Sequence, residues 1–178
     1  MKCVRMFFVA LFPYLIIILF IISNTSLEKF LPDNIFIPLS IYIGWYFVAL
    51  ISAVITFVSG ITNKRKSLEM LRINMIVKLI HVPAYLCIFV VGLGCMLTIF
   101  TFGITIIFIL LDLMTIVLSG LIGLGGILRS LRENKISIKA AVIHGIFQFV
   151  FCADIISSIV LYRTVKATEY KLEAKLML

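Results

Sequence analysis

The chain has 178 residues, of which 63% are hydrophobic and only 13% are charged, and its formal net charge is +8. A soluble domain is about 45–50% apolar, so the polar residues are too few to cover a soluble surface. The apolar residues form long continuous runs, whereas the strands of membrane barrels alternate between apolar and polar residues. The composition therefore excludes a soluble protein and predicts one all-α domain, a polytopic bundle of transmembrane helices.

The basic residues lie in short clusters between the apolar runs, which is the pattern of cytoplasmic loops. The net charge therefore does not indicate a nucleic-acid partner, and we expect anionic lipid headgroups beside these clusters at the cytoplasmic face. The four cysteines form no CxxC pair, and three of them fall inside apolar segments. We expect no disulfide, no metal site and no cofactor.

The apolar runs predict about five spans, at residues 6–22, 35–61, 79–101, 104–128 and 140–162. Residues 79–128 contain no Lys or Arg and are too long for one span, which needs about 20 residues, so we predict a turn near Gly103. The first run is predicted to be a retained helix because no cleavage site follows it. Residues 67–78 are amphipathic and predict a helix in the interface plane. Residues 163–178 form a charged tail.

The distribution of Lys and Arg predicts a cytoplasmic N-terminus, because the outer loop at residues 23–34 carries only Lys29. Five spans then leave a basic tail on the outer side, which conflicts with the positive-inside rule. In the alternative arrangement, the polar fifth segment dips into the membrane and returns, which gives four true spans and a cytoplasmic tail. We prefer five spans.

Polar and small residues recur at helical spacing on one face of each of the last three spans. The set comprises Asn74, Lys78, His81, Tyr85 and Gly92 on the third span; Asp112, Thr115, Ser119, Gly123 and Gly126 on the fourth; and His144, Gln148, Phe151 and Ser158, with Asp154 beside them, on the fifth. Ionisable groups inside a membrane usually face the bundle interior or a wet cavity. We therefore expect these three faces to meet.

Helical rise gives each ionisable group a predicted depth. Asp112 and Asp154 would share a layer in the outer half of the membrane, and His81 and His144 would share one near the cytoplasmic side. Two facing carboxyl groups tend to share a proton, so the two layers form a candidate route for protons or cations. The alternative is polar packing, in which Asp112 bonds Thr115, Ser119 or a neighbouring helix, and Lys78 extends toward the headgroups.

Small residues on two spans predict close helix contacts, since small side chains let helix backbones approach each other in a membrane. The predicted packing residues are Ala49, Ala53, Gly120, Gly123 and Gly126.

Residues 78–85 (KLIHVPAY) and 118–123 (LSGLIG) resemble segments of an uncharacterised family of small multi-pass bacterial membrane proteins. The resemblance extends over roughly the last two-thirds of the chain. It implies a location in the bacterial cytoplasmic membrane and no particular activity.

The sequence contains no nucleophile elbow, no HExxH motif, no phosphate-binding loop and no paired-Cys motif. We predict a non-enzymatic membrane protein that acts through helix association, as a homo-oligomer or as a subunit beside another membrane protein. One alternative is a small transporter or a proton- or cation-coupled channel that uses the intramembrane Asp and His residues. A second alternative is a membrane enzyme that acts on lipid, with a cleft around Lys78, His81 and His144.

Overall fold

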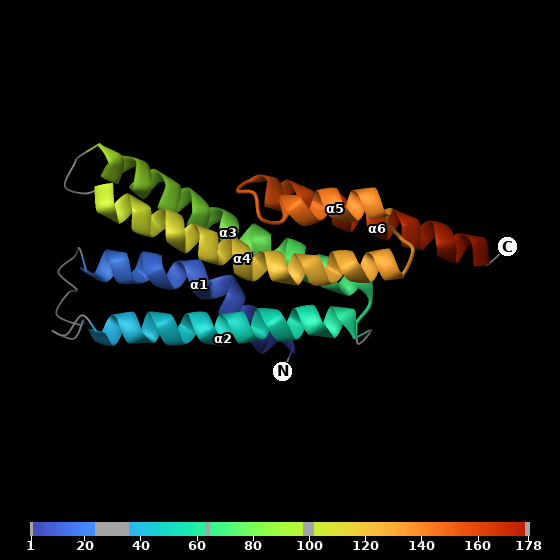
Figure 1. Cartoon of the computed structure of the whole chain (residues 1–178), viewed down its shortest axis with the longest axis horizontal. Coiled ribbons are helices and arrows are strands. Elements are labelled where there is room, and N and C mark those ends of the chain that lie inside the picture. Colours follow the sequence, from blue (N-terminus) through green and yellow to red (C-terminus); the bar gives the residue numbers. More distant parts are fainter. Residues whose placement is uncertain (1, 24–35, 63–64, 98–101, 177–178) are drawn as a thin grey trace. The chain divides into compact units, whose positions relative to one another are not determined.

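The computed structural model describes residues 2–23, 36–62, 65–97 and 102–176. In these residues the regular elements are all α-helices, which confirms the predicted all-α class. They are α1 (Lys2–Ser23), α2 (Phe36–Ile61), α3 (Ser67–Met96), α4 (Phe102–Arg132), α5 (Ile138–Phe147) and α6 (Ala153–Leu176), as Figure 1 shows. The predicted outer loop, past Ser23, and Thr101 of the predicted central turn lie outside the described residues.

Three helices of the described chain are long and apolar enough to cross a bilayer: Leu39–Ile61, Ser67–Met96 and Gly103–Arg132. α1 and α5 contribute the shorter apolar stretches Met6–Leu15 and Ile138–Phe147. These lengths support a membrane protein, whereas the prediction of about five spans is not supported.

Residues 67–78 are the first part of α3 and do not form a separate helix in the interface plane. The sequence has no helix breaker at the predicted junction between residues 78 and 79, so the helix continues to Met96. Its polar residues Asn74 and Lys78 are fully buried, while Arg72 is exposed. The polar residues of this segment are thus divided: Glu69 and Arg72 are exposed, whereas Asn74 and Lys78 point into the protein.

The prediction of one continuous helix over residues 140–162 is wrong, because the chain reverses after Phe147. α5 ends there, and α6 starts at Ala153 and runs back beside α5 (Figure 1). The reversal places Cys152 in the left-handed region, at φ 63°. Ser137 is the N-cap of α5, and its side chain accepts a hydrogen bond from the Ala140 N–H.

The chain folds into two compact units, and α2, α3 and α4 each contribute to both. Unit 1 comprises Met1–Ser52 and Ile80–Thr115, and unit 2 comprises Ala53–Leu79 and Ile116–Leu178. The core of unit 1 includes Ile88, Phe108 and Leu111. The core of unit 2 includes Leu71, Ile127, Ala141, Leu161 and Val165.

Candidate functional site: a buried polar centre

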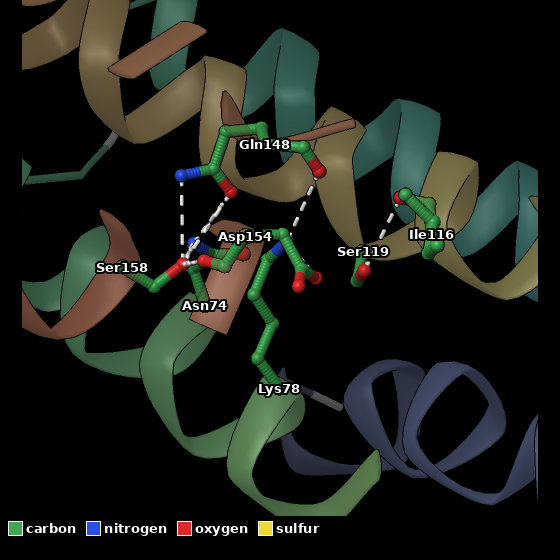
Figure 2. Close-up of polar contacts among 7 residues, drawn as sticks. All are labelled: Asn74, Lys78, Ile116, Ser119, Gln148, Asp154 and Ser158. Carbon is green, nitrogen blue, oxygen red and sulfur yellow. Dashed lines mark hydrogen bonds and ion pairs between the residues drawn. The ribbon is translucent and has the colours of Figure 1, made fainter. Parts of the chain in front are cut away.

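A lysine and an aspartate form an ion pair inside unit 2. Lys78 Nζ on α3 lies 2.7 Å from Asp154 Oδ2 on α6, and neither side chain is exposed to solvent (Figure 2). Lys78 Nζ also donates a hydrogen bond to the carbonyl oxygen of Gln148, at 3.2 Å. Buried charges are stable only when they are paired and hydrogen-bonded. This pair meets both conditions.

Amide and hydroxyl groups extend the site from the ion pair. Asn74 Nδ2 donates to Gln148 Oε1 at 3.2 Å and to Ser158 Oγ at 2.9 Å. Ser158 Oγ in turn donates to the Asp154 carbonyl oxygen at 2.7 Å. We call Asn74, Lys78, Gln148, Asp154 and Ser158 the polar centre. It joins α3, α6 and the segment between α5 and α6 (Figure 2).

The polar centre lies at the interruption between α5 and α6. Local contacts stabilise both the backbone of this interruption and the charge of Asp154. Within the interruption, the Phe149 N–H bonds to the Ile146 carbonyl and the Ala153 N–H bonds to the Phe151 carbonyl. These two backbone donors are therefore satisfied locally, as a membrane interior requires. Asp154 lies in the first turn of α6, where the helix dipole favours a negative charge.

Glycines on α4 provide the space that the polar centre occupies. A Cβ atom at Gly123 would lie 2.2 Å from Gln148 Oε1 and 2.9 Å from Asn74 Nδ2. Gly120 faces Phe149 in the same way, and Gly126 faces Leu71. The small residues of α4 that were predicted to pack helices thus contact groups of the same chain in unit 2. Ala49 and Ala53 of α2 are also fully buried.

Two acceptor oxygens of the polar centre have no hydrogen-bond donor among the described residues. They are Asn74 Oδ1 and Asp154 Oδ1, and both atoms are buried. Buried polar atoms are usually satisfied. These two oxygens are therefore positions where a bound hydrogen-bond donor would be stabilised.

His144 and Ser119, two other predicted site residues of unit 2, bond to groups outside the polar centre. His144 Nδ1 lies 2.8 Å from Ser157 Oγ and links α5 to α6. Ser119 is buried and donates to the Ile116 carbonyl of its own helix, at 3.2 Å (Figure 2). Both residues are thus accounted for by contacts within or between helices.

Asp112 belongs to unit 1, whereas Asp154 belongs to unit 2, so the predicted meeting of the two acids stays a prediction. The same holds for the predicted layer of His81 and His144. Asp112 Oδ1 is buried and has no hydrogen-bond donor among the described residues.

His81 compensates for a proline in α1. A proline removes the N–H that would bond to the carbonyl four residues earlier, so Pro13 leaves the Val9 carbonyl without its helical donor. His81 Nε2 lies 3.0 Å from this carbonyl oxygen. Since a carbonyl only accepts, Nε2 is the donor. Tyr14 donates a hydrogen bond to the Ile80 carbonyl of α3.

The main contact that sequence reasoning missed is the partner of Asp154. The sequence places Lys78 on an inward polar face, or in the alternative near the headgroups, and does not pair it with Asp154. Two signals pointed to the observed arrangement. Asp154 suits the first turn of a new helix, and a basic tail on the outer side breaks the positive-inside rule. Asn74 and Ser158 were assigned to polar faces but not to a site.

A family model described as "Family of unknown function (DUF6652)" matches residues 2–167. No curated protein and no solved structure matches the chain. The match covers most of the chain and agrees with the expected uncharacterised family. The chain therefore belongs to this family of unknown function, DUF6652.

Proposed function

We propose that this protein is a multi-pass protein of the bacterial cytoplasmic membrane, with its N-terminus in the cytoplasm, and that its polar centre is a pathway for protons. The observation that carries the proposal is the buried Lys78–Asp154 pair at the interruption between α5 and α6. Ionisable residues inside a membrane protein are costly and usually functional. Transporters commonly place their binding sites at discontinuous helices.

The chemistry of the polar centre favours the proton over a metal cation. The ammonium group of Lys78 lies 2.7 Å from Asp154 and repels any other cation at that position. A proton on Asp154 removes this charge attraction and releases Lys78 from its partner. Asp154 Oδ1, which has no donor among the described residues, is the atom that we propose takes the proton.

Flux measurements in proteoliposomes test this proposal. An imposed potassium diffusion potential should drive proton uptake into vesicles with the wild-type protein, recorded with a pH-sensitive dye. Asp154→Asn and Lys78→Met should abolish the uptake. Thr164→Ala, which removes an exposed hydroxyl from α6, is the control and should transport normally.

Because removal of one charge can unfold the protein, the double variant Lys78→Met with Asp154→Leu is also needed. Replacement of a whole buried ion pair by apolar residues is often tolerated, so this variant should fold and carry no proton flux. A normal flux through the double variant would exclude the polar centre as the proton pathway.

A second function, association with another membrane protein or with further copies, is favoured by Asp112. Its buried Oδ1 atom has no donor among the described residues, and polar groups stabilise helix association in membranes. Native gels of mildly solubilised membranes should show a complex larger than the monomer, and Asp112→Asn should reduce it. A lipid-modifying enzyme has less support, because Lys78 is fully buried in its ion pair.

A further inference from the structure

Asp112 lies on α4 at the edge of an apolar, exposed helix face. Ile106, Ile109 and Leu113 are about half exposed, at 48%, 60% and 52%, and follow helical spacing along this face. Asp112 itself is partly buried. It lies ten positions from the start of α4 at Phe102, which at about 1.5 Å per residue places it near the middle of a bilayer core of about 30 Å.

The Oδ1 atom of Asp112 has no hydrogen-bond donor within the described part of the chain, and a carboxyl group at this depth calls for a donor or a positive charge. Unit 1 offers no Lys or Arg inside its predicted spans: residues 6–22, 36–52 and 80–115 contain neither, and Lys2 and Arg5 precede the first span. His81 of the same unit already contacts the Val9 carbonyl through Nε2. The charge that would complement Asp112 is therefore absent from the spans of unit 1.

A second copy of the chain is poorly suited to supply this charge. Its deeply placed lysine, Lys78, is fully buried in the pair with Asp154. We propose that Asp112 and the face formed by Ile106, Ile109 and Leu113 bind a transmembrane helix of a different protein, one with a Lys or Arg near the middle of its span. The inference rests on the second function proposed above and names the chemistry of the partner.

The bound helix packs on the apolar face, and its basic group reaches Asp112 from the edge. In the membrane interior, opposite charges attract far more strongly than in water. The ion pair therefore selects a basic helix over an apolar one of the same length.

A pair of synthetic helices tests the inference. Both are Leu-rich transmembrane peptides labelled with an energy-transfer acceptor, one with a single central Lys and the other with Leu at that position. They are mixed with donor-labelled full-length protein in phosphatidylcholine vesicles. The Lys peptide should give a higher transfer efficiency than the Leu peptide with the wild-type protein.

Variants assign the binding to the carboxylate. Asp112→Asn should lower the transfer from the Lys peptide to the level of the Leu peptide, and Asp112→Glu should retain it. Thr115→Val removes a buried hydroxyl bonded to the Leu111 carbonyl and is the control, which should bind the Lys peptide normally.

The outcomes separate this inference from the function on which it rests. Equal transfer from both peptides overturns the basic partner while leaving helix association in place. Absence of transfer from either peptide, in a protein that also runs as a monomer on native gels, contradicts association as well. Self-association of the wild-type protein that Asp112→Asn abolishes would assign Asp112 to contacts between copies and overturn the inference.

Discussion

In this chain, a polar side chain inside a membrane helix can hydrogen-bond to a backbone carbonyl, and such a side chain can also form part of a binding site. His81 was a predicted member of a proton route on the basis of its type and helical position. Its Nε2 atom contacts the Val9 carbonyl that Pro13 leaves free, and its part in a proton route stays a prediction. Helical spacing identified the inward face correctly, since Asn74, Lys78 and His81 are all buried. Spacing alone says nothing of which partner each side chain meets on that face.

The contact between His81 and Val9 makes a prediction for a pair of substitutions. His81→Phe should lower the free energy of unfolding by about 1–3 kcal/mol, because it leaves a buried carbonyl unsatisfied. In a Pro13→Ala background the restored N–H can bond to that carbonyl, so the same substitution should cost much less. Unfolding in mixed micelles, followed by circular dichroism, measures both effects. An equal loss in the two backgrounds would show that His81 does not act through this carbonyl.

At the scale of elements, the positions of α1, α2 and α4 and the second part of α3 followed from the apolar runs, because long apolar runs can only be satisfied as helices in a membrane. The reversal between α5 and α6 could not be derived this way. No proline or glycine occurs between Gln148 and Cys152, so the local sequence carries no helix breaker. The reversal depends on contacts between distant segments, such as the bond from Lys78 to the Gln148 carbonyl.

A charged cluster ties the start of α3 to the segment after α4 and makes a prediction about pH. Burial raises the pKa of Glu133, but hydrogen bonds from Lys135, Ser67 and Arg129 and the charge of Lys135 outweigh it and lower the pKa from 4.5 to about 2. A carboxyl group whose pKa is lowered on folding stabilises the folded state when the pH is above its ordinary pKa, here 4.5. This stabilisation is lost as the pH falls from about 4.5 to about 2.

Glu133→Gln should therefore reduce the stability of the folded protein by about 1–2 kcal/mol near neutral pH. The difference from the wild type should shrink as the pH falls through this window, which thermal unfolding in detergent at several pH values would record. Glu173→Gln, on an exposed part of α6, should have no such effect. A difference that stays constant down to pH 2 would contradict the role of the carboxylate.

At the scale of the whole chain, the membrane class and the helical class followed from composition, whereas the path of the last third did not. The second half of α6 lies beside the loop that follows α4, since Lys135 Nζ of this loop is 3.3 Å from Glu169 Oε2. This arrangement resolves the conflict of the five-span prediction, because the basic residues of the tail then join the basic loops. We expect all of them on the cytoplasmic side.

Cysteine labelling tests this expectation, with Lys139→Cys in the first turn of α5, Lys171→Cys in α6 and Lys29→Cys in the predicted outer loop, each placed in a background without native cysteines. An impermeant maleimide should label positions 139 and 171 only in inverted vesicles and position 29 only in intact spheroplasts. Positions 139 and 171 share one side because the chain between them reverses instead of crossing. Labelling of 139 and 171 from opposite sides would restore a fifth span. Labelling of both from outside, with position 29 inside, would keep the reversal and invert the orientation.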